Sequence, residues 1–125
     1  MVRMPHTFIK VGDLLKLECR FWMTVDGEKV FGRGPCILLK NIDRLGSLNR
    51  AAKEMNMSYS KAWSIIHRAE KALGYSLLET KSGGLDGGGS SLTWEAKKLI
   101  KVYEKFLMEA EELVNKLYEE HFKGV

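Results

Sequence analysis

Residues 47–74 read SLNRAAKEMNMSYSKAWSIIHRAEKALG, which predicts two helices joined by a tight turn. Ser47 and Ser58 are predicted helix N-caps, because a serine hydroxyl can accept a hydrogen bond from an unpaired amide of the first helical turn. Gly74 suits a helix end. Each helix has one apolar stripe: Leu48, Ala51, Ala52 and Met55 on the first, and Ala62, Ile66, Ala69 and Leu73 on the second. Such pairs occur in DNA-binding proteins and in ordinary helical hairpins, so this stretch alone leaves both interpretations open.

The second helix carries the candidate contacts to DNA. Its polar N-terminal end suits the major groove, where helix-start amides and hydroxyls bind phosphates and polar side chains approach base edges. The predicted DNA-binding residues are Ser58, Tyr59, Ser60, Lys61, Ser64, His67 and Arg68 of this helix, with Arg50, Lys53 and Lys81 from its surroundings. We expect Ser60, Lys61 and Ser64 to approach bases. We expect His67, Arg68 and the basic residues outside this helix to contact the DNA backbone. Trp63 borders the apolar stripe and is interpreted mainly as a packing residue.

Composition restricts the class of protein. The chain has 125 residues, of which 45% are hydrophobic and 29% charged, as expected for one globular domain. No apolar run approaches the roughly 18 residues of a membrane span, and the N-terminus has no signal-peptide core. Cys19 and Cys36 are isolated, so we expect reduced thiols in a cytoplasmic protein without a zinc site. No nucleophile–base pair, carboxylate dyad or metal cluster stands out, so we expect neither an enzyme nor a cofactor.

The positive charge is concentrated around the helix pair. Residues 35–83 hold eight Lys/Arg against four Asp/Glu, whereas residues 94–125 hold six against seven. This distribution favours a polyanionic partner, here double-stranded DNA. A solvated charged face can give a similar count, so the charge supports DNA binding without deciding it.

A β-hairpin is predicted over residues 14–34. Apolar and polar residues alternate strictly from Leu15 to Val25, as in a half-buried strand, and Asp26-Gly27 suits a type I′ turn. The cross-strand partners would be Met23 with Val30 and Trp22 with Phe31. The aromatic pair would lie on the outer face, where it forms a contact surface or is covered by another element or a second subunit.

A third helix precedes the helix pair. Pro35 suits the first turn of a helix over residues 35–45, and Gly46 suits its end. Its apolar stripe would consist of Ile37, Leu38, Ile42 and Leu45. Helices over about 35–45, 48–55 and 58–73, with a sharp turn before the last, form the core of a helix-turn-helix domain.

A wing is predicted after the third helix of this core. Residues 75–81 suit a strand, residues 82–90 contain five glycines, and residues 91–93 suit a short return strand. A strand, loop and strand at this place would lie beside the major groove and reach a phosphate or the minor groove. A nucleotide-binding loop is disfavoured because no Gly-Lys-Ser/Thr element follows the glycines.

One long helix is predicted from Thr93 to about His121. It carries a heptad seam, and the predicted dimer-interface residues are Leu99, Tyr103, Phe106, Ala110, Leu113 and Leu117. At about 1.5 Å per residue this helix is longer than a small winged domain can cover. The economical partner is the same helix of a second copy in a two-fold homodimer. The alternative is that the whole helix packs on the N-terminal hairpin of its own chain.

Two motifs join the helix pair to the polyglycine loop: GSL(x2)AA(x4)MSY(x2)AW over residues 46–63, and SGG(x2)GGG(x2)LT over residues 82–93. Together they resemble the DNA-binding domain of ModE-type molybdate-responsive regulators, which is itself similar to the winged helix-turn-helix of LysR-type regulators. The resemblance covers roughly residues 14–122. It implies a dimeric transcription factor whose third helix reads a palindromic operator.

Two departures limit what the resemblance implies. The family usually has a basic residue in the middle of the wing, where this chain has Leu85-Asp86, and Asp86 would repel phosphate. The family's regulators also carry C-terminal domains that bind molybdate or tungstate, whereas this sequence ends at Val125. We therefore expect no molybdate binding by this chain.

The expected fold is α+β, mostly α, in a single domain over residues 1–125. It comprises a β-hairpin (14–34), a winged helix-turn-helix (35–93) and a dimerisation helix (94–122). The expected function is sequence-specific DNA binding by a transcriptional regulator, as a homodimer on a palindromic operator, without membrane association. The alternative is a winged-helix protein-interaction module that does not bind DNA and uses the Trp22/Phe31 surface or the long helix.

Overall fold

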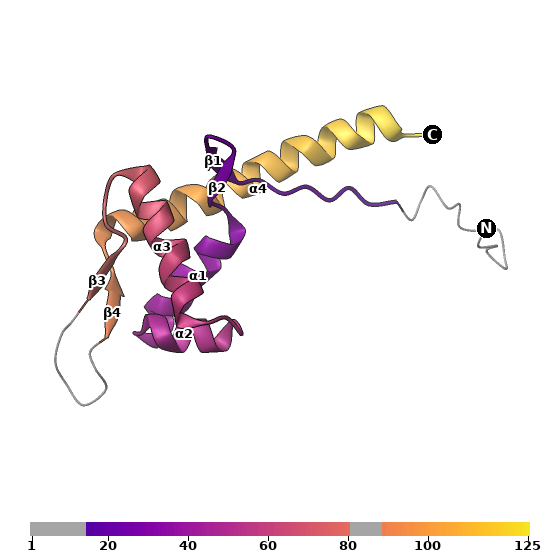
Figure 1. Cartoon of the computed structure of the whole chain (residues 1–125). Helices are drawn as coiled ribbons and strands as arrows, with labels where there is room; N and C mark the ends of the chain where they lie inside the picture. Colours follow the sequence, from indigo (N-terminus) through magenta and orange to yellow (C-terminus); the bar gives the residue numbers. More distant parts are fainter. Residues whose placement is uncertain (1–14, 81–88) are drawn as a thin grey trace, which may run out of the picture. The chain divides into compact units, whose positions relative to one another are not determined.

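The computed structural model describes residues 15–80 and 89–125. The predictions for Lys81, for Leu85-Asp86 and for most of the glycine loop lie outside these residues. The described elements follow the order β1, β2, α1, α2, α3, β3, β4, α4, as Figure 1 shows. They fall into two compact units, one spanning Phe21–Lys105 and the other combining residues 15–20 with 106–125. The predicted class, mostly helical with small β-hairpins, is confirmed.

The N-terminal hairpin is shorter than the sequence predicts. β1 (Met23–Val25) pairs antiparallel with β2 (Glu28–Phe31) around Asp26 and Gly27, whose φ angles of 51° and 83° suit the predicted type I′ turn. The prediction of a strand over residues 15–22 is wrong. β2 has only four residues, so the chain before Met23 has no ladder to join, whatever its side-chain alternation.

Next to the turn the register is the predicted one, with Thr24 opposite Lys29 and Val25 opposite Glu28, but the two predicted pairs Met23 with Val30 and Trp22 with Phe31 are wrong. Met23 stands opposite Phe31, and a bulge between Met23 and Thr24 shifts the pairing by one residue. Phe31 is not exposed beside Trp22: it is buried and meets the ring of Tyr103 edge-on, with 5.2 Å between centroids. The Tyr103 hydroxyl donates to the carbonyl oxygen of Phe21 at 2.8 Å. Packing against α4 therefore draws Phe31 inward and leaves Trp22 as the exposed aromatic residue of the hairpin.

Three consecutive helices form the helix-turn-helix core: α1 (Arg33–Leu45), α2 (Leu48–Glu54) and α3 (Tyr59–Leu73). The predicted caps are confirmed. Ser47 accepts a hydrogen bond from the amide of Arg50 at 3.2 Å, and Ser58 accepts one from Lys61 at 3.0 Å. Gly46 and Gly74 end α1 and α3 with φ angles of 73° and 84°, which an L-residue with a side chain rarely adopts. Short-range signals thus set the ends of these helices.

The core is built from small and branched apolar residues on the facing sides of these helices. The buried residues are Cys36, Leu38, Leu39 and Ile42 of α1, Leu48, Ala51 and Ala52 of α2, and Ala62, Ile66 and Ala69 of α3. The alanines of α2 and α3 let the helices approach closely. Ile37 was predicted to join the stripe, and this is wrong: it is 42% exposed. The buried face of α1 is centred on Leu38, Leu39 and Ile42, and Ile37 projects away from it.

The base of the predicted wing is present. β3 (Leu78–Thr80) pairs antiparallel with β4 (Ser90–Leu92), so that Leu78 lies opposite Leu92. The amide of Ser90 donates to the carbonyl oxygen of Gly46 at 2.9 Å. A Cβ at Gly89 would lie 2.8 Å from that same oxygen, so this close approach requires glycine. The wing base is thereby attached to the turn between α1 and α2.

The long helix α4 (Trp94–Phe122) confirms the predicted element. Thr93 caps it, because its Oγ1 accepts a hydrogen bond from the amide of Ala96 at 3.1 Å and donates one to the Ser76 carbonyl at 2.8 Å. Ala96 and Tyr103 are its buried residues, and both lie in the unit that contains the helix-turn-helix. Large apolar side chains farther along, Leu113 and Leu117 among them, are exposed.

Membrane-spanning helices and metal-ligand clusters are absent from residues 15–80 and 89–125. No helix there is both long and apolar enough to cross a membrane, and no three His, Cys, Asp or Glu side chains gather as metal ligands do. Cys19 and Cys36 are free thiols. Burial raises the pKa of the Cys36 thiol, and the nearby Glu104 carboxylate raises it further, so Cys36 keeps its proton and acts as a small core residue.

Candidate nucleic-acid interface

The face of α3 opposite the core gathers the predicted DNA-binding residues. Ala62, Ile66 and Ala69 attach the helix to the core. All seven predicted contacts at the start and along this helix are exposed: Ser58, Tyr59, Ser60, Lys61, Ser64, His67 and Arg68. The helical repeat separates the buried residues from the exposed ones, because a narrow apolar stripe leaves most of the helix surface to polar and charged residues.

The start of α3 has the electrostatic character of an anion-binding end. The Ser58 hydroxyl accepts a hydrogen bond from the Lys61 amide. The proton of the hydroxyl remains available to a ligand. The first backbone bond of the helix runs from the Ala62 amide to the Ser58 carbonyl at 3.1 Å, so the amides of Tyr59 and Ser60 precede the ladder. No acidic residue occupies the first turn. The partial positive charge of the helix end is therefore available to a phosphate.

The exposed face of α3 has a central row and two chemically different edges. At about 100° per residue, Ser60, Ser64, His67 and Lys71 follow one row along the middle of the face. One edge of that row is basic, with Lys61 and Arg68. The other is aromatic, with Tyr59 and Trp63. Lys71 is not among the predicted contacts, although its spacing of four residues after His67 was a signal for it.

The prediction that Trp63 is mainly a packing residue is wrong. It is 47% exposed, and its ring stacks on the imidazole of His67 with 3.6 Å between centroids and 17° between planes. Two of the buried residues of α3, Ala62 and Ile66, lie near Trp63 in sequence but point about 100° and 60° away from it around the helix. Trp63 thus belongs to the exposed aromatic edge.

His67 is fixed by hydrogen bonding within α3. Its Nδ1 lies 2.9 Å from the carbonyl oxygen of Trp63, and because a carbonyl only accepts, Nδ1 is the donor. Its Nε2 lies 3.7 Å from Glu70 Oε1, while Glu70 Oε2 accepts a hydrogen bond from the Leu77 amide at 2.7 Å. A carboxylate beside the imidazole repels a phosphate, so these contacts make His67 a poorer phosphate ligand than its exposure alone indicates.

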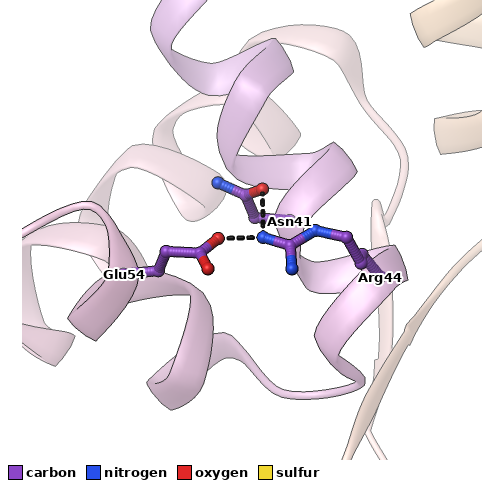
Figure 2. Close-up of polar contacts among 3 residues, drawn as sticks. All are labelled: Asn41, Arg44 and Glu54. Atoms are coloured by element: carbon purple, nitrogen blue, oxygen red, sulfur yellow. Dashed lines mark hydrogen bonds and ion pairs between the residues drawn. The ribbon is translucent and has the colours of Figure 1, made fainter.

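The helix α2, which carries two of the predicted basic residues, packs against α3. Arg50 and Lys53 are exposed. Arg44 at the end of α1 is engaged differently: Figure 2 shows it between Asn41 Oδ1, at 3.1 Å, and the carboxylate of Glu54. That contact ties α1 to α2 and neutralises Glu54, the acidic residue of α2. The charge that α2 presents to a ligand is therefore positive.

The predicted dimer seam divides in two along α4. Tyr103 is buried within the chain against Phe31, so its ring is not available to a second copy. Leu99 and Ala110 are half-buried, whereas Phe106, Leu113 and Leu117 are exposed. The large apolar side chains of this seam therefore lie mainly in the second part of the helix.

Known proteins match the segment that contains this interface. Residues 37–97 match the family described as "Bacterial regulatory helix-turn-helix protein, lysR family", and this interval runs from α1 through β4 into the first turn of α4. The transcriptional regulator ModE of Haemophilus influenzae is 42% identical over 67 residues, which cover 54% of this chain and 26% of that protein. The molybdenum transport protein ModE of Azotobacter vinelandii is 34% identical over 82 residues, covering 66% and 30%.

The match to these relatives thus spans about a quarter to a third of their length. Among solved structures, the "CbnR_DBD-DNA complex" is similar with a TM-score of 0.52 and 20% identity, covering 66% of this chain and 90% of that one. This likeness shows the fold. The sequence match and this shared fold make residues 37–97 similar to the helix-turn-helix domain of the bacterial regulatory lysR family.

Proposed function

We propose that this chain is a DNA-binding transcriptional regulator that inserts α3 into the major groove of double-stranded DNA. The observation that carries the proposal is the exposed face of α3, with its capped N-terminus, central polar row and basic edge, on a helix-turn-helix of a regulatory family. Relatives named as transcriptional regulators and a structural neighbour bound to DNA support it.

The charge and length of each side chain, and its place on α2 or α3, decide whether it contacts base edges or phosphates. Ser60, Lys61 and Ser64 lie near the start of α3, the part of a recognition helix that enters the groove, and they approach base edges. Lys61 suits the O6 and N7 acceptors of a guanine. Arg50 and Lys53 on α2 bind phosphates, as the first helix of such a pair crosses the DNA backbone.

A second copy of the chain completes the proposed regulator. The exposed side chains Leu113 and Leu117 are spaced four residues apart, which suits packing against an identical helix. A two-fold dimer presents two recognition helices, so the proposed operator is a palindrome with half-sites about 34 Å apart along the duplex.

A gel-shift titration with genomic DNA fragments tests the proposal. We expect binding at low ionic strength that weakens steeply between about 50 and 200 mM salt, because phosphate contacts release counterions. Absence of salt-sensitive binding to any fragment, with the purified chain folded, would overturn the proposal. It would instead favour a winged-helix module that binds a protein.

A further inference from the structure

We infer that Trp63, held in place by His67, recognises the 5-methyl group of a thymine in the major groove. This inference rests on the proposed insertion of α3 and deepens it by naming a base. It concerns Trp63 on the aromatic edge of the helix, a residue that is not among the predicted DNA contacts.

Trp63 offers an apolar surface in a place where the other exposed side chains are mostly polar. It is the fifth residue of α3, within the turns that enter the groove, and 47% of its surface is exposed although it is a large aromatic residue. It lies next to Ser64 in sequence and one turn after Tyr59. The thymine methyl is the apolar group that the major groove presents, and it suits contact with an apolar side chain.

The surroundings of Trp63 keep its ring in one orientation. The His67 imidazole covers one ring face at 3.6 Å and is itself tied to the Trp63 carbonyl at 2.9 Å. Glu70 stands 3.7 Å from the far nitrogen of His67, and the Leu77 amide anchors Glu70 at 2.7 Å. A ring that is already ordered loses little rotamer freedom on binding, so the contact retains more of its free energy.

The same contacts separate this edge from the basic edge of the helix. Glu70 places negative charge beside His67, and no basic side chain lies between Tyr59, Trp63 and His67 on this side of the helix. Lys61 and Arg68 occupy the other edge. The aromatic edge is therefore suited to an uncharged apolar group of a base rather than to a phosphate, and His67 is a positioning residue for Trp63.

Replacement of thymine by uracil tests the inference, because it removes only the methyl group. A duplex enriched by the full chain from a random pool is resynthesised with deoxyuridine at one thymine at a time, and affinities are measured by fluorescence anisotropy. We expect uracil at one position of each recognised site to weaken binding about three- to fivefold, the effect of one buried methyl group. Trp63→Ala removes this difference, Trp63→Phe retains part of it, and His67→Ala reduces it.

Trp94→Ala is the matched control, because Trp94 is an exposed tryptophan on α4 and outside the recognition helix. It should keep the full difference between thymine and uracil. Equal affinity of the chain for every uracil duplex, an enriched sequence without thymine, or a difference that survives in Trp63→Ala overturns the inference alone. A pool in which nothing is enriched overturns the proposed function and the inference together.

Discussion

We propose that single side chains at the start of α3 give the interface its selectivity. Lys61 carries a positive charge at the edge of the exposed face, whereas Arg50 lies on the neighbouring helix α2. A charge near base edges distinguishes sequences, while a charge near phosphates strengthens binding to every sequence alike. Substitution of Lys61 should therefore change the discrimination between DNA sequences, whereas substitution of Arg50 should change the affinity for all sequences.

Lys61→Ala should reduce discrimination between an enriched duplex and a random one by about 5- to 100-fold, as expected for loss of a base contact. Arg50→Ala should weaken binding to both duplexes by the same factor and lower the slope of log affinity against log salt by about one. Anisotropy titrations of both duplexes at several salt concentrations measure these effects. Equal behaviour of the two variants would contradict the assignment.

Ser58→Ala should lower the free energy of unfolding by about 1 kcal/mol, because the Lys61 amide loses its acceptor. Ser60→Ala is the control, since Ser60 lies in the same turn and its exposed hydroxyl faces solvent; it should change stability by less than about 0.5 kcal/mol. Urea unfolding followed by circular dichroism measures both. A larger loss in Ser60→Ala would show that the cap is not what stabilises this turn.

Secondary-structure elements were predictable where their signals are local. Ser58 and Gly74 bound α3 through contacts within one turn, so reading the sequence located the helix to within a residue. The length and cross-strand pairs of the hairpin were predicted wrongly, because they depend on residues far along the chain. Phe31 turns inward to meet Tyr103. Trp63 was wrongly predicted to be a packing residue. The buried stripe of α3 consists of two alanines and one isoleucine and is too narrow to include it, although tryptophan is hydrophobic.

The attachment of the wing base to the α1–α2 turn depends on the absence of a side chain at position 89. Gly89→Ala should lower the free energy of unfolding by about 1–3 kcal/mol, because its Cβ would press on the Gly46 carbonyl and displace the Ser90 hydrogen bond. Ser91→Ala is the control: it changes a half-buried residue of β4, the strand that follows Gly89, without adding an atom near the Gly46 carbonyl, and it should lower stability less than Gly89→Ala does. Urea unfolding of both variants distinguishes a specific clash from a general effect of alanine.

At the scale of the whole molecule, the proposed dimer depends on the second part of α4. Leu113→Lys combined with Leu117→Lys should convert a dimer into a monomer, because each charge would be buried in the helix–helix contact. Asn115→Lys, on another side of the same helix, should leave the dimer intact. Light scattering after size exclusion gives the mass, and a wild-type chain that is already monomeric would contradict the proposed assembly.

In the proposed function, the exposed face of α3 reads the sequence of double-stranded DNA. Selection of duplexes from a random pool by the purified chain, in parallel with Lys61→Ala, tests this. We predict that the wild-type chain enriches one related set of sequences and that Lys61→Ala shifts or broadens that set. A wild-type pool whose base composition after selection equals that of the starting library would contradict the claim.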